Sequence, residues 1–221
     1  MNTEGILIIL SGFSGAGKGT IMKELMSRHA ADYALSISAT SRKPRVGEED
    51  GVHYFFKTRE EFQQMIAAGE LLEYAEYVGN YYGTPKAYVM DQLKQGRNVI
   101  LEIEMQGGQK VKAAYPETRM IFVTTPSAEI LKDRLVGRGT ETAEVIADRL
   151  HRAYEESDGI GQYQYLLVND DLDTAVETLH QLIMNDKNGN SSLNEEFLVT
   201  KNTEFIKTMR KELSGFAKGD H

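Results

Sequence analysis

The chain has 221 residues, enough to bury a proper core in one domain that carries insertions. Its 33 acidic and 25 basic residues give a net charge of −8, which argues against general attraction to nucleic acid or to anionic membranes. The absence of cysteine excludes disulfides and thiolate chemistry, and the scattered histidines do not have the spacing of a zinc site. No apolar stretch approaches the roughly 18 residues of a membrane span, and the N-terminus does not resemble a signal peptide. We therefore expect a cytoplasmic protein that binds neither nucleic acid nor membrane.

Strand-like and helix-like segments alternate along most of the chain. Ile6–Leu10 is a continuous aliphatic run, as in a strand buried on both faces of a parallel sheet, and a glycine-rich turn and a helix to about His29 follow it. Later strands are expected at Tyr33–Ser38, Asn98–Met105, Met120–Thr124 and Tyr165–Val168, with helices at Ala128–Val136, Ala143–Glu156 and Thr174–Met184. This alternation predicts an α/β fold with a parallel sheet and right-handed crossovers.

Residues 36–90 have the pattern of an inserted α+β subdomain. A polar, basic loop at Ala39–Glu49 precedes a helix that the capping-box residues Thr58 and Glu61 open and that stops near Gly69. A small paired sheet is then expected at Leu71–Val78 with a turn at Asn80–Gly83, and a further helix begins at Thr84-Pro85 and runs to about Gly96.

The C-terminal tail is expected to be a linker followed by an amphipathic helix. Asp186–Ser192 has the composition of a linker, and residues 202–215 place four apolar side chains on one stripe, namely Phe205, Ile206, Met209 and Leu213. An isolated helix of this length is marginal in water, so the stripe should pack against something. We favour docking on the protein's own core over docking on a second subunit, with no direct role in the chemistry.

The stretch SGFSGAGKGT, residues 11–20, almost matches the phosphate-binding pattern G-x-x-x-x-G-K-[ST]. A glycine-rich turn between a buried strand and a helix presents backbone N–H groups to an anion at the positive end of the helix dipole, and Lys18 adds a cation. These features predict an ATP site made of Gly12, Phe13, Ser14, Gly15, Ala16, Gly17, Lys18, Gly19 and Thr20.

Gly19 stands where the serine or threonine that holds magnesium would follow the lysine. Mg²⁺ retains several waters readily, so it can still be held by nucleotide phosphates and, through water, by neighbouring acids. We therefore expect Mg²⁺ as cofactor without a direct protein ligand, and Thr20 beside the α-phosphate of the donor. The stretch GAGKGT resembles the loop of adenylate kinases and of some guanylate kinases, which points towards nucleoside monophosphate kinases and away from GTPase switches.

A second phosphate site is predicted in the basic loop. Arg42 and Arg45 are three residues apart in a turn stiffened by Pro44, so both guanidinium groups can converge on one phosphate. This loop, together with Glu73 and the stretches GNYYGT and GRGTET, closely resembles guanylate kinase from about Gly5 to Asp186.

The resemblance implies a P-loop NTPase-type parallel sheet flanked by helices, with an inserted α+β GMP-binding subdomain and a helical lid. It implies a guanylate kinase-like domain at residues 1–186, and residues 187–221 form the linker and terminal helix. Within that domain the expected core is 1–35, 91–126 and 157–186, the insertion is about 36–90, and the lid is about 127–156.

The resemblance also implies the acceptor site. The GMP phosphate is expected to bind Arg42, Arg45, Tyr54 and Tyr82, guanine is expected to bind Ser38, Glu73 and Thr84, and Glu48 is expected to brace Arg45. Guanine presents two adjacent donors that suit a carboxylate such as Glu73, whereas adenine would leave that carboxylate partly unsatisfied.

Two acids and three arginines complete the expected site. Glu102 and Glu104 replace two aspartates that are usual in the family, and Glu104 is assigned to the acceptor ribose or base edge and, through water, to magnesium. A single buried acid paired with an arginine is the alternative for these positions. Arg134, Arg138 and Arg149 match the lid arginines that converge on the donor phosphates. Asn169 and Asp170 match the adenine-side turn, although ordinary helix capping explains them equally well.

These residues together predict ATP-dependent phosphorylation of GMP or dGMP in purine nucleotide metabolism. Catalysis would depend on charge neutralisation by Lys18, Arg42 and the lid arginines, without a general base, because the attacking phosphate is already an anion. The alternatives are a kinase for another phosphorylated acceptor and a non-catalytic guanylate kinase-like interaction module; Glu73 argues against the first and Lys18 against the second. A regulatory GTPase is disfavoured because no guanine-reading N/T-K-x-D element is evident. The oligomeric state stays open.

Overall fold

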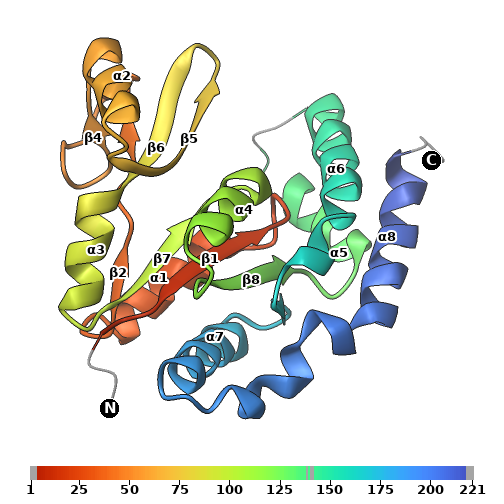
Figure 1. The fold of residues 1–221 in the computed structure, drawn as a ribbon. Helices are drawn as coiled ribbons and strands as arrows, with labels where there is room; N and C mark the ends of the chain where they lie inside the picture. Colours follow the sequence, from red (N-terminus) through yellow and green to blue (C-terminus); the bar gives the residue numbers. More distant parts are fainter. Residues whose placement is uncertain (1–3, 138, 140–141, 218–221) are drawn as a thin grey trace. The chain divides into compact units, whose positions relative to one another are not determined.

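The computed structural model describes residues 4–137, 139 and 142–217 (Figure 1). Contacts between residues divide the chain into two compact units, 1–9 with 31–119 and 10–30 with 120–221. None of the helices in the described ranges combines the length and the apolar character that crossing a bilayer requires.

Five strands form the central sheet in the order β2-β7-β1-β8-β9. Their bounds are Leu7–Gly12 (β1), Tyr33–Leu35 (β2), Asn98–Glu102 (β7), Arg119–Thr124 (β8) and Tyr165–Val168 (β9). The pairs β2–β7 and β8–β9 are parallel, and Ile8, Ile9 and Leu10 of β1 are fully buried. The predicted α/β fold with a parallel sheet is therefore confirmed. Two strands end earlier than predicted, since β2 stops at Leu35 and β7 stops at Glu102.

The first unit contains a second, smaller sheet in the order β4-β3-β6-β5. Its strands are Ala39–Thr40 (β3), Phe55–Phe56 (β4), Leu71–Tyr77 (β5) and Asn80–Pro85 (β6), and β5 and β6 form an antiparallel hairpin (Figure 1). The helices of this unit are Arg59–Ala67 (α2), Lys86–Lys94 (α3) and Met105–Ala114 (α4). The capping box of Thr58 and Glu61 opens α2 as predicted.

The turn of that hairpin lies earlier than predicted. Tyr77 pairs with Asn80, so the two turn residues are Val78 and Gly79, and the expected turn at Asn80–Gly83 lies within β6. Both turn residues have positive φ, 47° and 73°, as a two-residue type I′ hairpin requires. Pro85 is the last residue of β6 and occupies the N-cap position of α3, one residue before the first helical position where it was predicted.

The helices of the second unit are Lys18–Arg28 (α1), Ala128–Val136 (α5), Ala143–Ser157 (α6), Leu172–Lys187 (α7) and Thr203–Ala217 (α8). The described part of this unit also contains 3₁₀ helices at Ile160–Gln162 (η1), Ser191–Phe197 (η2) and Val199–Lys201 (η3).

The predicted linker at Asp186–Ser192 begins too early, because α7 continues to Lys187, and the residues after it are packed against the protein. Asp186 belongs to α7 and is buried, and its Oδ1 accepts hydrogen bonds from Tyr165 Oη at 2.8 Å and Asn194 Nδ2 at 3.0 Å. Asn194 Nδ2 also donates to the carbonyl oxygen of Leu182 at 2.9 Å. Asn194, two residues beyond the predicted linker, therefore docks this segment onto α7, where Asp186 and the Leu182 carbonyl satisfy its side-chain amide.

The terminal amphipathic helix is confirmed as α8. Met209 and Leu213 are 2 % and 0 % exposed, whereas Phe205 and Ile206 are half-buried. The helix packs along α6 and also contacts α5 (Figure 1). The helix therefore docks on its own chain, the alternative that the sequence favours.

Candidate active site

The predicted phosphate loop connects β1 to α1 and is fixed at both ends. A Cβ on Gly12 would lie 2.2 Å from the carbonyl oxygen of Val123, so only glycine allows this close approach. Phe13 is fully buried and meets the ring of Phe122 edge-on at 5.0 Å between centroids. Gly17 precedes α1 with φ of 91°, and the first turn of α1 holds no acidic residue. The loop therefore leaves the positive end of the helix dipole available to an anion.

Asn169 supports the loop from the other side. Its Nδ2 donates to the carbonyl oxygen of Ala16 at 2.8 Å, and a Cβ on Gly17 would lie 2.4 Å from the same nitrogen. The alternative role of Asn169 as a helix cap is wrong, because Asp171 caps α7 by accepting from the backbone N–H of Thr174 at 2.9 Å. Asn169 is buried and holds the loop through its side-chain amide.

Lys18 folds back over the loop. Its Nζ donates to the carbonyl oxygens of Gly12 at 2.7 Å and Phe13 at 3.1 Å. These bonds hold the ammonium group beside the backbone that would surround a phosphate.

Two of the three predicted lid arginines reach this region. Arg149 Nη1 donates to Ser14 Oγ at 2.6 Å, and Arg134 Nη2 donates to the carbonyl oxygen of Asp170 at 3.3 Å. Arg138 lies outside the described residues. A cavity of about 270 Å³ beside the loop is lined by Gly15, Gly17, Thr20, Arg134, Asn169, Asp170 and Leu172. The cavity is thus bounded by Arg134 and by glycines of the phosphate loop, and Lys18 and Arg149 bond to the same loop.

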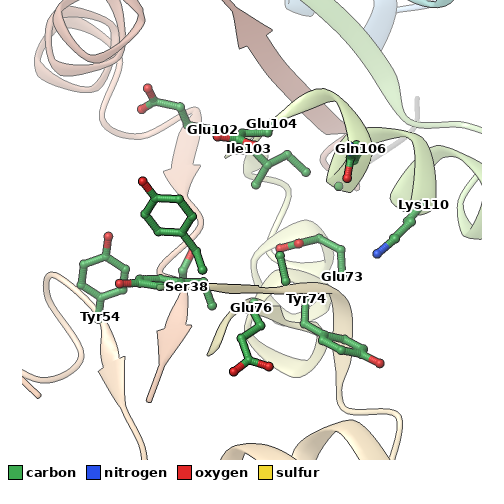
Figure 2. A pocket seen from close by; sticks show the side chains of 15 residues that line it. Ser38, Tyr54, Glu73, Tyr74, Glu76, Glu102, Ile103, Glu104, Gln106 and Lys110 are labelled. Carbon is green, nitrogen blue, oxygen red and sulfur yellow. The ribbon is translucent and has the colours of Figure 1, made fainter. Parts of the chain in front are cut away.

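A larger cavity, of about 440 Å³, lies in the first unit (Figure 2). It is lined by residues of β5 and β6, of the loop after β7 and of α4, together with Ser38 and Tyr54. Tyr54 is at one end of this cavity, and Glu73 and Lys110 are at the other. The structure therefore brings the predicted residues Ser38, Tyr54, Glu73, Tyr82 and Glu104 to one space.

Glu73 is the most constrained acid of this cavity. Its Oε1 accepts a hydrogen bond from Thr84 Oγ1 at 2.7 Å, and Thr84 is fully buried. Burial raises the pKa of the Glu73 carboxyl above its ordinary value, and the Thr84 bond and the charge of Lys110 oppose that rise. Gly107 leaves room for the group, since a Cβ there would lie 3.2 Å from Glu73 Oε2. A carboxylate held in this way can accept two adjacent N–H donors.

Glu48 accepts hydrogen bonds from both arginines of the basic loop. Its Oε1 accepts from Arg42 Nη2 at 2.8 Å, and its Oε2 accepts from the backbone N–H of Arg45 at 2.7 Å. The Arg42 guanidinium, followed by the Arg45 backbone bond, lowers the pKa of Glu48 to about 2. The side chain of Arg45 is exposed. Glu48 therefore braces Arg45 through the backbone N–H, and its bond to the guanidinium of Arg42 is an addition that the sequence did not predict.

The aromatic residues predicted for the acceptor phosphate are close to Arg42. Its guanidinium carbon is 5.5 Å from the ring centroid of Tyr54, and the rings of Tyr54 and Tyr82 are 6.2 Å apart at 68°. These three side chains form one cluster in the first unit, so an anion there would meet one cation and two hydroxyl groups.

Glu102 and Glu104 are exposed and both line the larger cavity, so the alternative of a buried acid is wrong. Glu104 lies at the N-cap position of α4 rather than in the preceding strand. The same helix contributes Gln106 and Lys110 to the cavity, two residues that sequence analysis missed. Gln106 belongs to the EIEMQG stretch and Lys110 follows Gln106 by four residues, about one helical turn, and this spacing was the available signal.

The residues beside the phosphate loop fit a magnesium ion held mainly by phosphate oxygens and water. Gly19 supplies no hydroxyl, and a Cβ at this position would meet nothing within 4 Å, so the space around it is open. Thr20 and Asp170 line the adjacent cavity. Among the described residues, no group of three or more histidine or acidic side chains could by itself hold a metal ion.

A glycine-rich loop between a buried parallel strand and a helix, with Lys18 and two arginines around it, defines a P-loop nucleotide-binding protein of the kinase class. The protein-family model described as guanylate kinase matches residues 4–186. The chain belongs to the guanylate kinase family, and it is a transferase.

Relatives and a solved structure agree with this assignment. The chain is 52% identical over 180 residues to the guanylate kinase of Shouchella clausii (strain KSM-K16), covering 81% of this chain and 87% of that protein. It is 53% identical over 181 residues to the guanylate kinase of Bacillus anthracis, covering 82% and 88%, and 51% identical over 185 residues to that of Clostridioides difficile (strain 630), covering 84% and 90%. The crystal structure of guanylate kinase from Anaplasma phagocytophilum matches with a TM-score of 0.64 at 28% identity, covering 84% of this chain and 87% of that one.

Proposed function

We propose that this chain transfers the γ-phosphoryl group of ATP to GMP, or to dGMP, and releases ADP and the nucleoside diphosphate. Glu73 carries this proposal beyond family membership. It is a largely buried carboxylate, held by Thr84, and it faces a cavity large enough for a nucleotide base. Guanine is the purine that offers such a carboxylate two adjacent donors.

The donor half is the phosphate loop of the second unit. The backbone N–H groups of residues 12–20 would surround the ATP phosphates, and Lys18 would follow the transferring group. Arg134 and Arg149 are placed at the same loop and would neutralise its oxygens, a role we extend to Arg138. We assign Asn169 to support of the loop and, through its position, to the adenine side.

The acceptor half is the larger cavity of the first unit. Arg42, Arg45, Tyr54 and Tyr82 would hold the GMP phosphate, with Glu48 fixing the guanidinium of Arg42. Ser38, Glu73 and Thr84 would read the base, and Glu104 would contact the ribose or base edge.

The reaction then follows from charge. A phosphate oxygen of GMP forms a bond to the γ-phosphorus as the bond from that phosphorus to the bridging oxygen of ADP breaks, with the two oxygens in line. Magnesium, when bound, neutralises phosphate charge. Lys18 and the arginines stabilise the oxygens of the transferring group, and no side chain has to remove a proton because the acceptor is already an anion. Activity in the cytoplasm is part of the same proposal.

A coupled assay for ADP formation with ATP and each nucleoside monophosphate in turn tests this function. We expect turnover with GMP and dGMP and little with AMP, CMP or UMP. A Lys18→Ala preparation, purified in the same way, controls for contaminating kinases. Equal turnover of AMP and GMP would contradict the acceptor assignment, and no turnover of any acceptor would favour the non-catalytic interaction module.

Removing the charge of Glu48 should weaken the binding of GMP and leave the binding of ATP nearly unchanged. Glu48→Gln keeps the shape of the side chain but loses the ion pair that orients Arg42, so we expect KM for GMP to rise about fivefold to tenfold with KM for ATP within about twofold. Glu49→Gln, a change at the exposed neighbouring position, is the matched control. Equal changes in both KM values would show that Glu48 serves the fold rather than the acceptor phosphate.

The raised pKa of Glu73 predicts a pH dependence. The carboxylate accepts guanine donors only when ionised, so protonation weakens GMP binding as the pH falls towards this pKa. Because the pKa is raised, the loss begins at a higher pH than for an ordinary glutamate. We expect the ratio of kcat/KM for GMP between wild type and Glu73→Gln to shrink from about pH 8 to about pH 5. This ratio cancels the titration of the GMP phosphate, and a ratio independent of pH would contradict the assignment.

A further inference from the structure

The C-terminal segment of residues 188–217 lies outside the region that the family model matches, residues 4–186. It consists of η2, η3 and α8, and its last helix runs beside α6 (blue in Figure 1). The first part of the segment, η2, lies against α7, whereas α8 contacts α6 and α5, the helices that carry Arg149 and Arg134.

Arg210 of α8 holds the C-terminal end of α6. Its Nη1 donates to Ser157 Oγ at 3.0 Å and to the carbonyl oxygen of Tyr154 at 3.4 Å, and it forms an ion pair with Asp158. The guanidinium carbon also lies 4.6 Å from the ring centroid of Tyr154. The Tyr154 carbonyl is one of the last four of the helix and also accepts from Ser157 Oγ at 2.6 Å, and a cation here matches the helix dipole.

Glu212 of α8 holds the N-terminal end of α5. Its Oε2 accepts from the backbone N–H of Ala128 at 2.9 Å, which places a negative charge at the positive end of that helix. Lys132 Nζ of α5 also lies 4.9 Å from the ring centroid of Phe216. Arg210 and Glu212 therefore tie one added helix to opposite ends of two others.

Both helices contact the phosphate loop farther along their length. On α5, Leu131 and Leu135 lie against Gly15, whose Cβ would be 3.3 Å and 2.9 Å from their methyl carbons. On α6, Arg149 donates to Ser14 Oγ. A helix moves largely as a rigid rod, so a shift at the end held by α8 also moves the arginine near the loop. Displacements of about 1 Å in positioning groups can change rates by about a hundredfold.

We propose that α8 is a positioning element for the donor half of the active site, with Arg210 and Glu212 as positioning residues that act through Arg134 and Arg149. The proposal rests on the proposed function for the meaning of the donor site. It assigns a role to a segment that touches neither nucleotide cavity. It predicts that changes in this segment raise KM for ATP and leave KM for GMP unchanged.

The test is a double variant, Arg210→Met with Glu212→Gln, which keeps side-chain volume and removes both polar connections. We expect KM for ATP to rise about fivefold or more and KM for GMP to stay within about twofold. The matched control is Glu204→Gln with Lys207→Met, which removes an exposed ion pair within the same helix and should leave both constants unchanged. If the double variant is less stable but KM for ATP is unchanged, the proposal is wrong. An equal rise of KM for ATP and KM for GMP would also overturn it.

Two further measurements keep the result interpretable. Calorimetric titration with magnesium–ATP measures donor affinity directly, so the proposal can be tested even if the wild type fails to phosphorylate GMP and the proposed function falls. The same titration in an Arg149→Ala background should show a smaller effect of the double variant, because contacts that act through one residue are not additive. Full additivity in that background, together with full additivity in an Arg134→Ala background, would overturn the proposal. If the double variant is unfolded at the assay temperature, Arg210→Lys, which keeps the charge and loses the planar fork, must raise the ATP dissociation constant by about twofold.

Discussion

Lys18→Ala is expected to lower kcat by at least about a hundredfold, equivalent to about 2.7 kcal/mol of transition-state stabilisation. The ammonium group is held at the phosphate loop by the carbonyl oxygens of Gly12 and Phe13, where it meets the charge that develops on the transferring group. Because alanine removes that charge without entering the acceptor cavity, KM for GMP should stay within about threefold. Steady-state kinetics with ATP and GMP measure both effects.

Lys23→Ala is the matched control, since Lys23 is an exposed lysine on the same helix. It should leave kcat unchanged, and circular dichroism should show both variants folded. If the Lys18→Ala protein is folded and its kcat is normal, the assignment of the phosphate loop to the donor site is wrong.

Glu73→Gln is expected to lower kcat/KM for GMP by about a hundredfold. The amide keeps the size of the side chain and can still accept from Thr84, but it presents an N–H₂ donor towards the donors of guanine. Losing a charge-assisted bond and leaving a donor unsatisfied in a largely buried site costs about 3 kcal/mol, which corresponds to that factor. KM for ATP should stay within about threefold because only the acceptor base meets this carboxylate.

Glu76→Gln is the control for this change. Glu76 is on the same strand and lines the same cavity, but its carboxylate pairs with Arg59 and is exposed. We expect its effect on GMP to be within about twofold, as for other surface ion pairs. Equal losses for GMP and ATP in Glu73→Gln would show that Glu73 is structural, and the base-reading role would be wrong.

Local sequence patterns were sufficient for the fold, and they named most of the residues that the structure brings together in two cavities. Three features depend only on neighbouring residues: the aliphatic run before SGFSGAGKGT, the capping box at Thr58, and the alternation of strands and helices. They can therefore be identified from the sequence alone. The same holds for the order of the nucleotide motifs, and the family that they indicated is confirmed by a match over residues 4–186.

Partner choice and exact turns were decided only in three dimensions. Spacing placed Arg42, Arg45 and Glu48 together, but side-chain torsions and the direction of each backbone N–H determined that Glu48 binds the guanidinium of Arg42. The hairpin turn moved to Val78 and Gly79 because strand pairing, rather than turn composition, sets its register.

Contacts between distant segments were equally out of reach of the sequence. Asp186 looked like the start of a linker, yet Tyr165 and Asn194 satisfy it inside the second unit. The apolar stripe of α8 predicted that this helix docks, whereas its location on α5 and α6 depends on the bonds of Arg210 and Glu212 to the ends of those helices. Amphipathicity specifies that a face must be buried, and only the folded chain specifies which polar groups remain at its edges to be paired.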